Sequence, residues 1–290
     1  LTPVTFYVLQ GLNGLAYGML LFLMAAGLSL IFGLMEVINL AHGAFYMLGA
    51  YLALSMVRWT GSFWIAALTA PLVLGAAGFL LEWEFLRPLY RRTHLDQILL
   101  TFGFAFVLSD LARWLWGADV QSLAPPPGLD RSIPMLGTLF PAYRLFVILL
   151  GTVLAGGLWL GLNRTRLGAM VRAGVADKEM TQALGIDIGL VFTGVFAFGT
   201  ALAGLAGVIA APIQGVFPGV DFEILIVTLI VVVVGGLGTL GGSFWGSLLI
   251  GEVDTFGKTL VPQAALVFIY LIMAAILLVR PVGLFGGRSR

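Results

Sequence analysis

Nine long apolar runs occupy most of this 290-residue sequence and restrict the folds open to it. A helix needs about 20 mostly apolar residues to cross a bilayer, and most of the runs have about that length. Because 60% of the residues are hydrophobic and only 10% are charged, the chain cannot cover a water-exposed surface. We therefore expect one all-α, polytopic membrane domain over residues 1–290, with nine transmembrane helices, some short or broken, or eight if one run is re-entrant. The runs are 7–33, 37–57, 63–81, 97–116, 144–162, 189–211, 224–240, 243–258 and 264–280.

The basic residues between the runs predict which side of the membrane each connection occupies. Cytoplasmic loops of membrane proteins retain Lys and Arg, so we place the basic connections in the cytoplasm. The Pro- and Gly-rich segments 117–143 and 212–223 then form the outer face. The cations that define the cytoplasmic side are Arg87, Arg91, Arg92, Arg164, Arg166, Arg172, Lys178, Arg280, Arg288 and Arg290.

Residues 164–187 form the longest charged stretch between apolar runs in the second half of the chain. Charged side chains are costly inside a bilayer, so this stretch must lie outside the hydrocarbon. Asp177 is a good N-cap and Gly185 a good C-terminal stop, which predicts a short helix from Lys178 to Leu184. Its face of Met180, Ala183 and Leu184, with charged flanks, fits a groove on a partner protein, although a solvated loop is the alternative.

The block 235–242 (GGLGTLGG) is the densest of the glycine-rich stretches. Gly238, Gly242 and Gly246 recur at four-residue spacing, which lets two helices approach closely in lipid. A second interpretation is a break between two short helices, of the kind that transporters place near a substrate path.

Two patterns resemble nucleotide-binding loops, and neither fits. Gly236, Gly238 and Gly241 form a GxGxxG, but the alternating strands and amphipathic helices of a dinucleotide-binding unit are missing. Gly257-Lys258-Thr259 ends like a phosphate-binding loop, but Glu252 stands where that loop requires glycine. We therefore expect no ATPase in this chain. A net charge of +1 also argues against a nucleic-acid partner.

Polar residues within the apolar runs are the remaining candidates for function. With two His and no Cys, the sequence predicts no metal cluster and no catalytic nucleophile with its base. Asn39 and His42 mark either a pathway or a bend at which they satisfy backbone groups. Asp110 is followed at i+3 by Arg113, which predicts an ion pair near the outer interface. By default, the span-end acids are solvated at the interface; they are Glu36, Glu252 and Asp254.

Several motifs together resemble the permease subunits of branched-chain amino acid ABC importers, of the LivH type. The resemblance runs along nearly the whole chain. In one place this chain differs from the general importer pattern. Where the cytoplasmic loop of importers has Glu-Ala-Ala followed by Gly, this chain has Arg172-Ala173-Gly174 and a later Gly185. The matching motifs are 11–14 with Gly18, 27–33, 38–45 with 49–51, 183–186, 235–242 and 280–286.

The resemblance implies an importer permease fold and alternating access, driven by ATP and Mg that are bound by two cytoplasmic ATPase subunits rather than by this chain. It also implies a second homologous permease, an external solute-binding protein that docks on the outer face, and the bacterial inner membrane as location. The solute it implies is a small polar molecule, foremost a branched-chain or other amino acid, with urea, short amides and other small acids left open. The residues expected to couple to the ATPase are Arg172, Asp177, Lys178, Glu179, Met180, Ala183, Leu184 and Gly185. Those expected to line the translocation path are Asn39, His42, Tyr46, Thr101, Gly235, Gly236 and Gly238.

Two other classes of protein stay open at this point. A stand-alone secondary transporter would need its own ion-coupling group, for which Asp110 and Glu252 are the candidates. An intramembrane enzyme would need paired catalytic groups at one depth, and the sequence offers no such pair.

Overall fold

The computed structural model describes residues 3–286, and Arg288 and Arg290 lie outside this range. The fold is a bundle of helices, and each of the nine expected runs coincides with one of them. The helices are α1 (Pro3–Met35), α2 (His42–Thr60), α3 (Phe63–Leu81), η1 (Glu82–Leu86), η2 (Arg87–Arg91), α4 (His94–Trp116), α5 (Ala142–Arg164), α6 (Arg166–Ala176), α7 (Lys178–Ala183), α8 (Ile188–Gln214), α9 (Val220–Gly235), α10 (Leu240–Leu260), η3 (Pro262–Ala264) and α11 (Ala265–Val279).

Six helical segments within residues 3–286 are long and apolar enough to cross a membrane on their own. A seventh crossing results if α9 and α10, which meet at a bend of 119°, form one broken span. This agrees with a polytopic protein in which some spans are short or broken. The chain is a multi-pass membrane protein.

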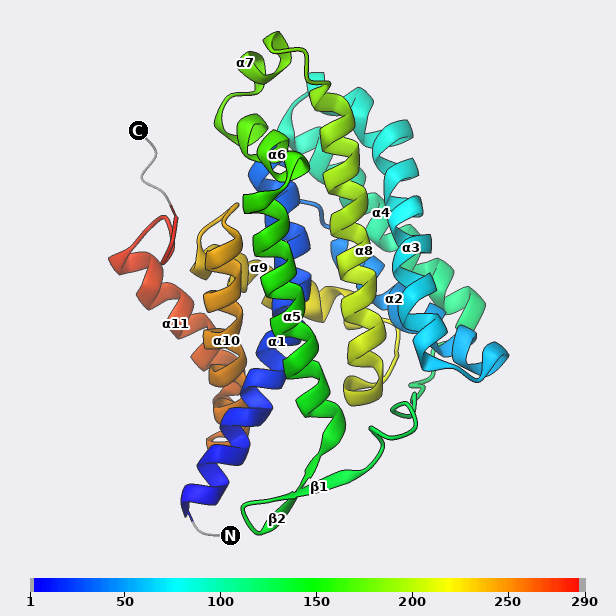
Figure 1. The fold of residues 1–290 in the computed structure, drawn as a ribbon, viewed down its shortest axis with the longest axis vertical. Helices are drawn as coiled ribbons and strands as arrows, with labels where there is room; N and C mark the ends of the chain where they lie inside the picture. The colour runs from blue at the N-terminus through cyan, green and yellow to red at the C-terminus, as the bar shows by residue number, and fades with distance from the viewer. Residues whose placement is uncertain (1–2, 287–290) are drawn as a thin grey trace.

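Helix α1 forms the centre of the bundle and packs against α5, α8 and α10 (Figure 1). Its middle part, from Met19 to Ser29, is buried on all sides. A helix that is apolar around its whole circumference belongs in the core, because no face of it prefers water. By contrast, α3, α4 and α11 expose many large apolar side chains, including Leu68, Phe106 and Leu271, as a lipid-facing surface requires.

The two ends of the molecule differ in charge and structure (Figure 1). Helices α6 and α7 lie at one end. Segment η2 reaches the same end, because Arg87 contacts Gly189 at the start of α8, just after α7. The start of α1 lies at the other end, with an antiparallel hairpin of β1 (Ser132–Met135) and β2 (Thr138–Pro141). The basic segments near 87–92 and 164–178 therefore share one end, as the charge distribution predicted.

The segment 212–223 lies beside the other expected outer segment, 117–143, and its residues are mostly half-buried or buried. Residues 212–214 continue α8, and residues 220–223 form the first turn of α9. Between them Val216 pairs with Gln121 and is fully buried, and Asp221 is only 2% exposed. The pairing keeps this turn against the segment 117–143, and from it α9 leads back into the bundle, so Pro and Gly mark a turn that is packed on the protein rather than a free loop.

The glycine block 235–242 shows both features that the sequence predicted as alternatives, a break between two helices and close packing of helices. Gly236 and Gly238 have φ of 111° and 75°, conformations that favour glycine, and here the chain breaks between α9 and α10. A Cβ on Gly235 would collide with the backbone of Gly242, so the two helices also touch directly. The block is therefore a break held by close glycine packing.

Candidate functional site

The connection between α1 and α2 is unwound backbone inside the bundle. After Met35, Glu36 adopts a φ of 58°, which is uncommon for a residue other than glycine. Helix α2 then begins at His42, whose Nε2 donates to the carbonyl oxygen of Met24 at 3.0 Å. Met24 lies three turns before the end of α1, or about 16 Å along the helix. Helix α2 therefore begins about halfway into the membrane, and non-helical backbone at that depth must be buried in protein or line a cavity.

Three of the residues predicted to line the path meet at this linker, which we define as residues 36–41. Asn39 Oδ1 accepts from the Ala41 N–H at 3.1 Å, and Thr101 Oγ1 on α4 accepts from the Leu40 N–H at 3.2 Å. With His42, all three side chains are fully buried and satisfy backbone groups at the bend. Asn39 Nδ2 and His42 Nδ1 have no hydrogen-bond partner among the described residues, so each side chain keeps one polar atom free.

Tyr46 lies one helical turn beyond His42 and contacts a different element. Its hydroxyl donates to Gln214 Oε1 at 2.7 Å, at the last residue of α8. Gln214 is a residue that the sequence did not single out. The signal that could have found it is its position two residues after Pro212. Tyr46 therefore joins the start of α2 to the point at which α8 ends.

The predicted glycines of the path lie apart from Asn39 and His42. Gly238 packs against Gly33 near the end of α1, whereas Gly235 faces α10. Gly236 packs against Gly286 in the C-terminal segment, whose Leu284 N–H donates to Val234 O at 2.8 Å. The break thus adjoins the end of α1 that leads into the linker.

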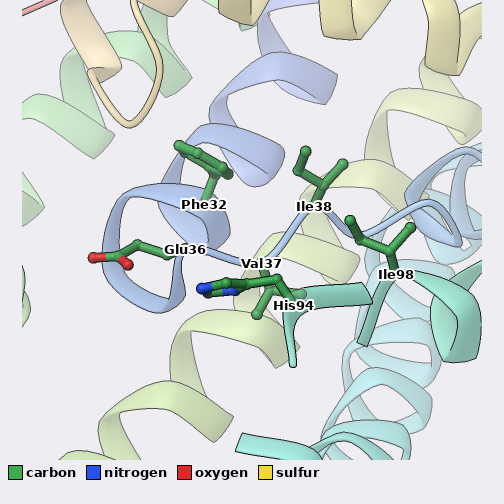
Figure 2. Close-up of a pocket in the computed structure, with 6 residues that line it drawn as sticks. All are labelled: Phe32, Glu36, Val37, Ile38, His94 and Ile98. Carbon is green, nitrogen blue, oxygen red and sulfur yellow. The ribbon is translucent and has the colours of Figure 1, made fainter. Parts of the chain in front are cut away.

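A cleft of about 430 Å³ opens beside the linker, at the end of the bundle that carries α7 (Figure 2). Its wall is mostly apolar, and it reaches as far as Ile38, the residue before Asn39. Glu36 and His94 supply the polar atoms at its rim. The lining residues are Phe32, Glu36, Val37, Ile38, His94 and Ile98.

The predicted coupling helix is present as α7. Asp177 Oδ1 accepts from the Met180 N–H at 2.9 Å, which confirms the N-cap, and Gly185 has the positive φ of a C-terminal stop, 85°. Met180 is 59% exposed and Leu184 is 73% exposed, so the apolar face is not covered within the described chain. Arg172 lies exposed on the preceding α6.

Helix α6 was not expected from the sequence, although two signals were present. Thr165 Oγ1 accepts from the Gly168 N–H at 3.1 Å as an N-cap. Gly174 packs against Leu34 of α1 and Ile188 of α8, which fixes α6 on the end of the bundle. Helix α6 therefore packs against the end of α1 and the start of α8, and α7 follows it along the chain.

An ion pair joins α7 to the linker. Lys178 Nζ, at the first position of α7, lies 3.5 Å from Glu36 Oε1, at the first position of the linker. The same ammonium group lies 5.8 Å from the ring centroid of Phe192 on α8. The predicted coupling segment is therefore in direct contact with the first residue of the linker that carries Asn39.

Asp110 and Glu252, the candidates for ion coupling, do not lie at a comparable contact between elements. Asp110 pairs with Arg113 at 3.9 Å, as predicted, and its side chain is 76% exposed. Glu252 lies against Gly14 between α1 and α10, away from the linker. Within residues 3–286, no group of three or more His, Cys, Asp or Glu is placed to hold a metal ion.

Comparisons with known proteins agree with this arrangement. The family described as "Branched-chain amino acid transport system / permease component" matches residues 11–277. The permease BraD of Pseudomonas aeruginosa is 29% identical over 97% of this chain and 96% of its own length. LivH of Salmonella typhimurium is 27% identical over the same shares, and LivM of that organism is 28% identical over 76% of this chain and 57% of its own length.

A solved structure supports the fold alone. PsaBC from Streptococcus pneumoniae, in complex with Fab, aligns over 92% of this chain and 89% of its own chain, with a TM-score of 0.50 and 14% sequence identity. The family match covers most of the chain, and it includes α1, the linker and α7. The chain therefore belongs to the permease components of branched-chain amino acid transport systems, the transmembrane subunits of ABC importers.

Proposed function

We propose that this permease moves amino acids, foremost those with branched side chains, across a bacterial inner membrane by alternating access. The support is the range of relatives: BraD, LivH and LivM are all named as high-affinity branched-chain amino acid transport permeases. Because LivH and LivM both resemble the chain, a second homologous permease is its natural partner, and residues 1–290 act as one domain of the pair.

The energy for transport comes from two cytoplasmic ATPase subunits, which bind the ATP and Mg. Helix α7 is the contact through which they act, because its exposed face of Met180 and Leu184 has the size and chemistry of a helix that docks in a groove. A binding protein delivers the solute at the outer face, on the segment 117–143, which includes the exposed hairpin.

The observation that carries the coupling proposal is the ion pair between Lys178 and Glu36. A movement of α7 shifts Glu36, and with it the start of the linker that holds Asn39 and the N-terminus of α2. The cleft beside the linker lies on the cytoplasmic side and ends next to Asn39. It is the route by which a solute leaves the free Asn39 and His42 nitrogens for the cytoplasm. Alternating access then consists of closing this cleft while the outer side opens.

The test is uptake of leucine into proteoliposomes that contain the chain with its ATPase, permease and binding-protein partners. Wild-type uptake should require ATP. Reversing the charges with Asp177→Lys and Glu179→Lys removes the cap of α7 and its acidic flank, and should lower uptake about fivefold or more, within the range of typical coupling energies. The ATPase should also co-purify less.

The matched control reverses two exposed acids at the opposite end, Asp119→Lys and Asp130→Lys, and should leave co-purification of the ATPase unchanged. Uptake of leucine without ATP would contradict the importer function. Full uptake by the Asp177 and Glu179 variant would contradict the role of α7 alone.

A further inference from the structure

Asp221 is a buried carboxylate that the transport path described above does not use. It lies in the first turn of α9 and is 2% exposed. Its backbone carbonyl packs against Gly43, the second residue of α2, which places it at the depth where α2 begins. Neither carboxylate oxygen has a hydrogen-bond partner of good geometry among the described residues. A group of this kind at membrane depth needs a counter-charge or a proton.

Two hydroxyl groups from other helices lie near this carboxylate. Ser109 of α4 is 4% exposed, and its hydroxyl lies beside Asp221. Tyr51 of α2 is fully buried, lies within electrostatic range of Asp221, and its hydroxyl has no hydrogen-bond partner in the described chain. The Tyr51 ring stacks on Trp116 with centroids 5.0 Å apart, which holds the phenol in place. Helices α4 and α9 thus bring the Ser109 hydroxyl and the Asp221 carboxylate together, and the buried Tyr51 hydroxyl of α2 lies within electrostatic range of them.

The protein supplies too little positive charge to neutralise Asp221. In the described chain, the ion pairs are Arg113 with Asp110, Lys178 with Glu36 and Lys258 with Asp254, and none includes Asp221. Arg113 is the cation that also acts on Tyr51, but its side chain is 56% exposed and engaged with Asp110. The N-terminus of α9, with the backbone groups of Gly219, Asp221 and Phe222, supplies a partial positive charge of about +0.5 of an elementary charge, which is less than the full charge of a carboxylate.

We propose that Asp221, Ser109 and Tyr51 form a binding site for a compact monovalent cation. One carboxylate and two hydroxyl oxygens are hard donors, which suit an alkali-metal ion or a primary ammonium group. The ammonium group would be that of the transported amino acid, in which case the site rests on the proposed function. The inorganic ion would be Na⁺ from the medium. In both cases the bound cation neutralises the part of the Asp221 charge that the α9 dipole does not balance.

The experiment measures thermal unfolding of the full chain in lipid nanodiscs. The buffer contains N-methylglucamine chloride, which is replaced stepwise by sodium chloride or by methylammonium chloride at constant ionic strength. A specific site should give a saturable rise in Tm of a few degrees, because a ligand that binds only the folded state stabilises it by mass action. Asp221→Asn should abolish the rise.

The matched control is Asp110→Asn, which removes an exposed carboxylate and should keep the full rise. Tyr51→Phe removes one oxygen donor and should raise the half-saturating cation concentration severalfold, and it serves as the second test if Asp221→Asn does not fold. A response to methylammonium alone assigns the site to an ammonium group of the solute, and a response to Na⁺ assigns it to an inorganic ion.

A Tm that changes equally in the wild type and in the Asp221→Asn and Tyr51→Phe variants, or that does not change at all, would overturn the site. The readout is binding to this chain alone. If no cation raises the Tm, the leucine uptake experiment is unaffected. If leucine uptake fails, the titration of Tm with sodium chloride still tests the cation site.

Discussion

At the scale of single residues, the unwound linker depends on side chains that satisfy its backbone. Buried N–H groups need partners, and Asn39 and Thr101 accept from two consecutive N–H groups of the linker. Glu36 has a different role, because it points away from the backbone to Lys178 on α7. These side chains fix both ends of a segment that has no helix to hold it.

The pair of Lys178 and Glu36 can be tested by exchanging the charges. Lys178→Glu places two acids together and should lower ATP-driven leucine uptake, whereas Lys178→Glu with Glu36→Lys should restore part of it. We expect at most about a fivefold effect, because a partly exposed ion pair contributes about 0.2–1 kcal/mol. The measurement is the initial uptake rate of Lys178→Glu, of Glu36→Lys and of the variant that combines both. Strictly additive losses in the double variant would show that the pair transmits nothing.

At the scale of elements, glycine decides where helices break and how closely they pack. The approach of α9 to α10 leaves no room for a methyl group at Gly235, whereas Gly241 has open space around its Cα. Packing through small residues stabilises helix contacts in lipid, where the hydrophobic effect between helices is absent. The bend of 119° between α9 and α10 therefore depends on particular glycines rather than on glycine content.

Two alanine substitutions in this block should differ sharply. Gly235→Ala forces the added Cβ into the Gly242 backbone and should lower Tm, because overpacking costs about 1–3 kcal/mol. Gly241→Ala adds the same methyl group where nothing lies within 4 Å and should change Tm little. The comparison uses purified protein in one detergent. Equal melting temperatures for the two variants would contradict the close packing at the break.

At the scale of the whole molecule, the two ends differ in charge and in structure. The end with α6 and α7 carries the exposed apolar face of Met180 and Leu184, and the other end carries the hairpin of β1 and β2. The basic residues place the first end in the cytoplasm.

This orientation can be tested by cysteine labelling, because the natural chain contains no Cys. Gln182→Cys on α7 and Leu136→Cys at the hairpin place single thiols at opposite ends, and both positions are exposed. In intact cells whose outer surface is accessible, a membrane-impermeant maleimide should label position 136 and not position 182. After the membrane is opened, both should react. Labelling of position 182 in intact cells would invert the predicted orientation.

Much of the architecture follows from local sequence, because the signals involved act over a few residues. Apolar runs require burial or lipid, so they located the nine long helices, and Asp177 and Gly185 placed the ends of α7 through hydrogen bonding and backbone freedom. Local spacing likewise predicted the ion pair of Asp110 with Arg113. It also indicated a bend at Asn39 and His42. Family membership was also readable, since its motifs are continuous stretches of sequence.

The sequence by itself therefore determined the membrane class, the long helices, the caps of α7 and the family, but not helix α6. Only the tertiary structure decided that α2 starts halfway into the bundle, that Lys178 meets Glu36 and that Asp221 is buried beside Tyr51 and Ser109. The segment 212–223 shows why: its Pro and Gly residues predicted a turn correctly, but not whether the turn is free in water or packed on the protein. Local propensity specifies conformation, whereas burial depends on contacts between residues far apart in the chain, which packing alone brings together.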